Sequence, residues 1–108
     1  MKFFQILVFI FLSHALYAQK SSGNSKAQQF YQIANRNLNN GNYTEAKNNL
    51  LKSLEIDPKF ATALQQLGDI LRKENDYKSA IEYYQKVLHI DPNLTPLTLF
   101  ALGESYLF

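Results

Sequence analysis

The feature that most constrains this chain is an internal repeat with a period of 34 residues. Ile56-Asp57-Pro58 recurs as Ile90-Asp91-Pro92, and at this offset nine of 34 aligned positions carry the same residue. The remaining identical pairs are Ala27/Ala61, Gln32/Gln66, Tyr43/Tyr77, Ala46/Ala80, Lys52/Lys86 and Leu54/Leu88. Periods of this length are typical of chains in which each unit stacks on its neighbours to bury a continuous core. We therefore predict two structural units, at residues 27–60 and 61–94.

Each unit has the pattern of two helices joined by a polar turn. The apolar residues of both units recur at helical spacing on either side of a break, at 39–41 in the first unit and 73–76 in the second. Asp57-Pro58 and Asp91-Pro92 should end the second helices, because the residue before a proline is disfavoured in the helical region. Gly41 suits the first turn because glycine readily adopts positive φ. The predicted fold class is all-α.

A helix–turn–helix unit of 34 residues with these side chains resembles the tetratricopeptide repeat (TPR). The second unit carries the pattern best, in Leu64, Leu67-Gly68, Leu71, Ala80, Tyr84 and Pro92. The first unit carries it in Phe30, Ile33-Ala34, Ala46, Leu50 and Pro58, but has Asn37 where a large side chain is usual. The resemblance implies that paired helices approach closely at the small residues Ala34, Ala46, Gly68, Ala80 and Gly103.

A third unit begins at residues 95–108. Leu99, Leu102-Gly103 and Tyr106 repeat the opening of the second unit one residue late, which predicts a fifth helix over about 97–108. The expected architecture is a TPR solenoid of two full repeats plus the first helix of a third. This last helix is apolar, whereas solenoids end in polar caps. The chain could be the leading part of a longer protein, the helix could pair with a second copy or another chain, or the solenoid could close imperfectly.

The first residues have the plan of a secretory signal. Lys2 is followed by ten residues, 3–12, with one polar interruption, and this run is shorter than the roughly 20 residues that span a bilayer. We predict a signal peptide at 1–18 that is cut after Ala18, although Leu16 is larger than the residue preferred there. Residues 19–26 have the polar composition of a flexible linker. The protein is therefore expected to be exported to the periplasm or cell envelope, or secreted, and to contact membrane only if the signal is uncleaved.

Composition argues against catalysis and cofactors. The chain has no cysteine, its glycines are isolated, and His89 has no second histidine or acid at metal-binding spacing. The net charge of +2 comes from interspersed charges, which argues against a nucleic-acid partner. Tyr43, Tyr77 and Tyr84 fall on repeat core positions, so packing explains them better than base stacking. We expect no enzyme, no catalytic residues, no metal and no cofactor.

The resemblance points to a binding surface, because in TPR proteins the first helices of successive units line a concave groove. Mapped onto this chain, the groove residues are Gln28, Tyr31, Gln32, Asn35, Thr62, Gln65, Gln66, Asp69 and Arg72. Amides can hydrogen-bond a peptide backbone, and Tyr31 can add apolar contact. A merely solvated polar face is the competing interpretation. The clamp that some TPR proteins use for chaperone carboxylates is not expected, because only Asn35 matches it.

The leading hypothesis is a protein–protein interaction module that binds a peptide or protein in its groove and acts in the bacterial cell envelope. One alternative makes the chain the N-terminal TPR segment of a larger outer-membrane or peptidoglycan-associated protein. A second makes it a self-associating scaffold, a homo-oligomer formed through the exposed last helix. The sequence does not identify the partner, because one fold hosts many functions.

Overall fold

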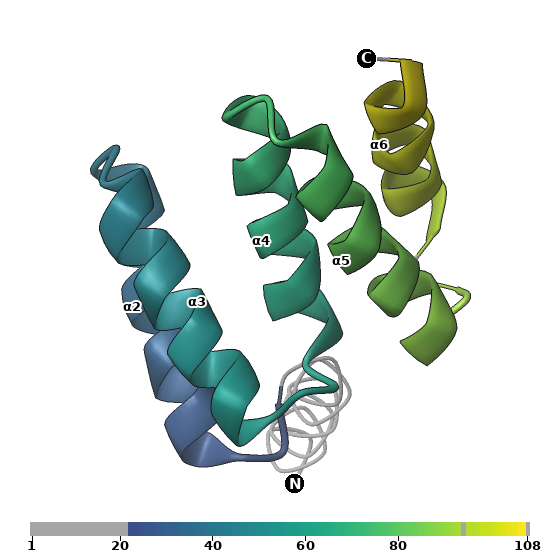
Figure 1. The fold of residues 1–108 in the computed structure, drawn as a ribbon. Coiled ribbons are helices and arrows are strands. Elements are labelled where there is room, and N and C mark those ends of the chain that lie inside the picture. The colour runs from purple at the N-terminus through teal and green to yellow at the C-terminus, as the bar shows by residue number, and fades with distance from the viewer. Residues whose placement is uncertain (1–21, 94, 108) are drawn as a thin grey trace, which may run out of the picture.

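A computed structural model describes residues 22–93 and 95–107. These residues form five α-helices and no strand, which confirms the all-α prediction. The helices are α2 (Ser25–Asn39), α3 (Tyr43–Ile56), α4 (Ala61–Lys73), α5 (Tyr77–Ile90) and α6 (Thr95–Leu107). Figure 1 shows them side by side, with the α2/α3 hairpin at one end, the α4/α5 hairpin in the middle and α6 at the other end. The predicted signal peptide at 1–18 lies outside the described residues.

Side-chain caps fix two of the helix starts. Asn24 precedes α2 in extended backbone, and its side-chain oxygen accepts hydrogen bonds from the backbone N–H groups of Lys26 and Ala27 at 3.0 and 3.2 Å. Asp76 accepts in the same way from the Ser79 N–H at the start of α5. Such caps satisfy donors that have no partner within the helix. The folded part therefore starts slightly before Lys26, inside the segment whose composition predicts a linker.

The two Asp-Pro pairs end their helices as predicted. Asp57 and Asp91 follow α3 and α5 in extended backbone, with φ of −130° and −140°. Each carboxylate accepts a hydrogen bond from the N–H two residues later, in Lys59 and Asn93. These Asx turns hold the chain in a bend after the helix ends.

The turns inside the two hairpins repeat the same backbone requirement. Gly41 has a φ of 75°, and Asn75, which lies 34 residues later, has a φ of 65°. Glycine adopts this left-handed conformation without steric cost, and asparagine tolerates it better than most residues. The first turn confirms the assignment of Gly41, whereas the polar break of the second unit did not single out Asn75.

The main core lies between the two hairpins rather than inside each one. Its buried residues come from α2 and α3 (Ala27, Ala34, Ala46, Leu50) and from the start and body of α4 (Phe60, Ala63, Leu67, Ile70). A smaller cluster joins α5 to α6 through Ala80, Tyr84 and Ala101. Each hairpin therefore depends on its neighbour for burial, as expected for stacked repeats.

Gly68 confirms a predicted close approach, and Gly103 contradicts one. A Cβ atom built on Gly68 would lie 2.7 Å from a ring carbon of Tyr84, so α4 and α5 meet there without room for a side chain. A Cβ atom on Gly103 would meet nothing within 4 Å. The expectation for Gly103 is wrong because no described helix packs on that side of α6.

The tyrosines and Asn37 add two more findings. Tyr84 is fully buried, but Tyr43, which the repeat pattern assigns to the core, is 40% exposed, and its ring lies under the Lys73 ammonium at 5.8 Å. Asn37 occupies a position where a large side chain is usual, and its side-chain oxygen accepts a hydrogen bond from Asn49 on α3 at 2.9 Å. In the first unit this polar pair therefore links the two helices.

Candidate functional site

The four predicted groove residues of α2 lie on one side of that helix. Gln28, Tyr31 and Asn35 are half-buried and Gln32 is exposed. The three- and four-residue spacing places neighbours on a common face. Ala27 and Ala34 are fully buried in the core. The helix thus divides into a small apolar face toward α3 and α4 and a polar face that remains partly accessible.

The five predicted groove residues of α4 are all half-buried: Thr62, Gln65, Gln66, Asp69 and Arg72. The other side of α4 supplies Ala63, Leu64, Leu67, Gly68 and Ile70 to the interior. Alternation of buried and half-buried residues at this spacing is the mark of an amphipathic helix. The polar face of α4 is therefore neither fully solvated nor sealed.

Direct contacts join the α2 region to the α4 region. The Gln66 side-chain amide donates a hydrogen bond to the Asn35 side-chain oxygen at 2.7 Å. The ring of Tyr31 packs against that of Phe60, which precedes α4, with centroids 4.8 Å apart and a tilt of 46°. Tyr31 was expected to offer free apolar surface, but part of its ring is committed to Phe60. Phe60 itself was not singled out from the sequence, because its position between Asp57-Pro58 and the helix gives no periodic signal.

Two amide oxygens on this surface have no donor. The side-chain oxygens of Gln28 on α2 and Gln66 on α4 are buried, and neither accepts a hydrogen bond from the described residues. The Gln66 nitrogen is bonded to Asn35, which fixes the orientation of that amide. A buried acceptor without a partner costs about 1–3 kcal/mol, so each oxygen would gain from a donor brought by a ligand.

The C-terminal half of α4 belongs to a polar network instead. The Tyr84 hydroxyl donates to Asp69 at 2.6 Å, and Arg72 forms an ion pair with Glu104 of α6 at 2.7 Å. Arg72 also lies 3.9 Å from Asp69. Burial raises the pKa of Tyr84 well above its ordinary value, and the hydrogen bond to Asp69 and the charge of that carboxylate raise it further. Asp69 and Arg72 thus have internal partners, which single-residue patterns did not reveal.

A shallow hollow adjoins the predicted groove where the two hairpins meet. It has a volume of about 230 Å³ and is lined by Leu38, Tyr43, Gln66, Asp69, Ile70 and Lys73. Two of these residues, Gln66 and Asp69, are predicted groove residues. The ammonium of Lys73 lies over the Tyr43 ring, so the hollow presents one cation and one aromatic face.

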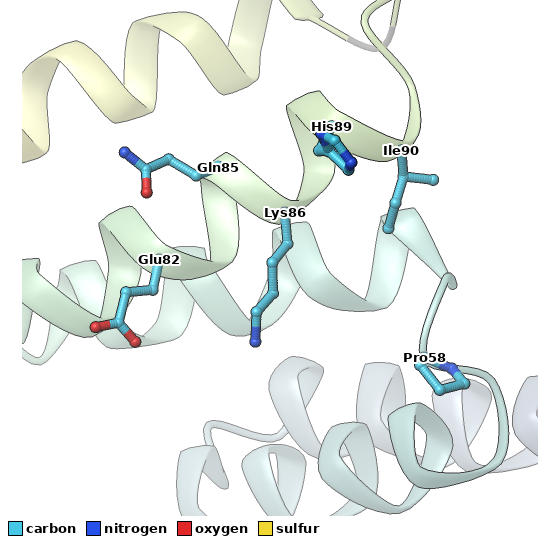
Figure 2. A pocket seen from close by; sticks show the side chains of 6 residues that line it. All are labelled: Pro58, Glu82, Gln85, Lys86, His89 and Ile90. Carbon is cyan, nitrogen blue, oxygen red and sulfur yellow. The ribbon is translucent and has the colours of Figure 1, made fainter.

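A second open hollow lies along α5, away from the predicted groove. Figure 2 shows its lining side chains, of which Ile90 and Lys86 extend toward the loop that carries Pro58. The others are Glu82, Gln85 and His89, all exposed. The described residues contain no group of three or more histidines, cysteines or acids placed to hold a metal. This hollow therefore lacks the convergent polar groups of a built site.

None of the helices in residues 22–93 and 95–107 combines the length and apolar character needed to cross a membrane. The position expected to carry a basic clamp residue in the third unit, Ala101, is buried against Ala80 and Tyr84. Asn35, the one residue that matches the chaperone-carboxylate clamp, is bonded to Gln66.

Comparison with known proteins places the repeats in a family. Family models described as "Tetratricopeptide repeat" match residues 27–60 and residues 61–94, which together exceed half of the chain. A curated relative is "Small glutamine-rich tetratricopeptide repeat-containing protein 2" of Mycosarcoma maydis, which is 36% identical over 53 residues. This similarity covers 49% of the chain but 15% of the relative. The chain thus matches a small part of that protein's length.

Proposed function

Because the chain belongs to the tetratricopeptide-repeat family, we propose that it is a protein-interaction module whose α2/α4 face holds an extended peptide segment of its partner. The α2/α4 face denotes Gln28, Gln32, Asn35, Thr62, Gln65 and Gln66, the predicted groove residues without an aromatic or charged commitment elsewhere. Members of this family are generally protein-binding scaffolds rather than enzymes, and the absence of catalysis is part of the proposal.

The observation that carries the proposal is the pair of unsatisfied oxygens on successive repeats. Gln28 and Gln66 each hold a buried acceptor without a donor. An extended peptide offers a backbone N–H at every residue other than proline, and those groups are strong donors. Binding would give these oxygens the partners that the described residues do not supply, so the gain exceeds that at amides already paired.

Charge argues for a neutral segment read through its backbone. Arg72 is paired with Glu104, and Asp69 accepts from Tyr84, so neither charge is free to select a ligand of opposite sign. The α2/α4 face itself is uncharged. This supports a peptide backbone as the ligand and disfavours an acidic chaperone tail, which needs free cations.

The test begins with a random-peptide display library panned against the purified chain. A selected peptide is then titrated by calorimetry against the wild type and the variants Gln28→Ala and Gln66→Ala. Loss of one hydrogen bond of about 0.5–1.5 kcal/mol should weaken binding roughly 2- to 10-fold. Glu55→Ala, at an exposed position on α3, is the matched control and should leave affinity unchanged. Equal affinities for all four proteins would place the peptide elsewhere and contradict the proposal.

The proposed site of action is the cell envelope or the exterior of a bacterium. The supporting observation is the plan of residues 1–18, with Lys2 before an apolar run that is short for a membrane span. N-terminal sequencing of the exported protein should begin at Gln19. Recovery of residues 1–18 in the membrane fraction would show an uncleaved anchor instead. A larger envelope protein that begins with this segment remains a prediction that genomic sequence would decide.

A further inference from the structure

Helix α6 buries one face and leaves the other open. Thr98, Ala101 and Ser105 are buried, and Ala101 packs with Ala80 and Tyr84 of α5. On the open side, the exposed fractions are 54% for Leu99, 64% for Phe100, 62% for Tyr106 and 82% for Leu107. Four large apolar side chains on thirteen helical residues form a continuous stripe, which is unusual on a surface that faces only water.

The stripe is symmetric about Gly103. Leu99 and Leu107 lie four residues on either side of it, and Phe100 and Tyr106 lie three residues on either side. With about 100° of rotation per residue, the two leucines point about 40° from the direction of Gly103 and the two aromatic residues about 60° from it. The buried Ala101 and Ser105, two residues away, point about 160° from it. Gly103 is therefore the centre of the open face as well as its smallest residue.

The chain itself shows what such a glycine accommodates. Gly68 and Gly103 hold the same place in the pairs Leu67-Gly68 and Leu102-Gly103. At Gly68 the ring of Tyr84 on the neighbouring helix fills the space where a side chain would stand, whereas the space at Gly103 is empty to 4 Å. A helix that approached α6 at Gly103 could therefore come as close as α5 does to α4.

The stripe is also electrically neutral. The one charged residue of α6, Glu104, is paired with Arg72 of α4 at 2.7 Å. The Tyr106 hydroxyl accepts a hydrogen bond from the Gln85 side-chain amide at 2.9 Å, which leaves the ring edge-on to solvent with its polar group satisfied. An identical neutral stripe can pack here without repulsion or burial of an unpaired charge, whereas a strongly charged helix gains nothing.

We propose that the α6 stripe is the interface of a two-fold homodimer in which the α6 helices of two copies pack antiparallel, centred on Gly103. A two-fold axis through Gly103 brings each residue against the one equally far on the other side. Phe100 then meets the partner's Tyr106, and Leu99 meets the partner's Leu107. Every exposed large residue of α6 finds an apolar counterpart, as an isologous interface requires. This interface lies outside the α2/α4 face and does not depend on the proposed peptide binding.

The first measurement is the mass of the purified full chain by light scattering across a concentration series. The wild type should reach the dimer mass, and Phe100→Glu and Leu107→Glu should hold the chain at the monomer mass with an unchanged helical circular dichroism spectrum. Leu51→Glu, on an exposed leucine of α3, is the matched control and should leave the dimer intact. Association through residues 1–18 would survive the two α6 substitutions, and that result would overturn the proposal.

Engineered cysteines then test the register, because the chain has no cysteine of its own. Under the proposed symmetry, oxidised Gly103→Cys links to itself, since a disulfide needs Cα atoms within about 4.4–6.8 Å. Leu99→Cys and Leu107→Cys should each stay unlinked alone and link to one another when mixed. If Gly103→Cys destabilises the chain, the mixed pair still decides the register.

Two results would overturn the inference. Self-linking of Leu99→Cys and of Leu107→Cys would indicate parallel packing or non-specific association. A wild-type chain that stays monomeric at the highest attainable concentration would leave the stripe for a helix from another protein or from further along a longer chain.

Discussion

Replacing Gly68 by alanine tests how α4 and α5 meet in the second repeat. The added Cβ would lie 2.7, 2.9 and 3.0 Å from three ring carbons of Tyr84, and contacts below 3.0 Å require atoms to move. The Tyr84 ring has little room to move, because the residue is fully buried and its hydroxyl is bonded to Asp69 at 2.6 Å. The substitution therefore sets a local helical gain against a tertiary clash.

The clash should outweigh the gain. Alanine in place of glycine within a helix is worth roughly 0.5–1 kcal/mol. Overpacking a well-filled core costs about 1–3 kcal/mol, and a shifted ring also strains the hydrogen bond to Asp69, a kind of bond worth about 1.5–3 kcal/mol. We expect a net loss in the free energy of unfolding of about 1–2 kcal/mol, which lowers Tm by roughly 4–16 °C for a fold of this size.

The assay is thermal and urea unfolding followed by circular dichroism at 222 nm. The matched control is Gly103→Ala at the equivalent place in α6, measured at a dilution where the chain is monomeric. Its Cβ meets nothing within 4 Å, so we expect a gain of about 0.5–1 kcal/mol. If Gly68→Ala is as stable as the wild type or more stable, the Tyr84 ring is not held against α4 and the reasoning fails.

Three further substitutions probe the caps, a buried hydroxyl and the pH response. Asn24→Ala should cost about 1 kcal/mol in urea unfolding because it removes the cap of α2, whereas Asn42→Ala should cost little because that residue precedes α3 without a side-chain cap. Ser53→Ala should cost about 1 kcal/mol through loss of the buried 2.7 Å bond to a carbonyl of α2, and an unchanged urea midpoint would contradict it. Burial and Asp69 raise the pKa of Tyr84 in the folded chain, so above about pH 10 the unfolded state loses this proton first and stability should fall by up to about 1.4 kcal/mol per pH unit. Tyr84→Phe should flatten that alkaline decline, and an identical pH profile in the variant would refute the assignment.

Much of the fold could be predicted because the signals are local and occur twice. The Asp-Pro pairs mark helix ends through a steric rule that acts between adjacent residues. The 34-residue offset then aligns the helices of one unit with those of the next, so a weak pattern in the first unit is supported by a clear one in the second. Helix α6 nevertheless starts at Thr95 rather than near Leu97, because Pro96 fits the first turn of a helix instead of preceding it.

The candidate site could be predicted less well because its properties depend on residues from several helices. Periodicity places Asp69 and Arg72 on the polar face of α4, but only the tertiary structure shows that Tyr84 and Glu104 occupy them. The unsatisfied oxygens of Gln28 and Gln66 likewise have no signature in sequence, since every glutamine carries the same acceptor. Gly103 was misjudged for the same reason, because a repeat pattern records a small residue and not whether a helix lies against it.

The sharing of the main core between hairpins has a consequence for synthesis on the ribosome. The first repeat emerges first, yet the core residues it contributes are mostly alanines, and the bulky side chains that pack on them, Phe60, Leu67 and Ile70, belong to the segment translated next. A nascent chain that has released only α2 and α3 holds a hairpin whose inner face has nothing large to bury. Completion of α4 should therefore be the moment at which the nascent chain first becomes resistant to proteases.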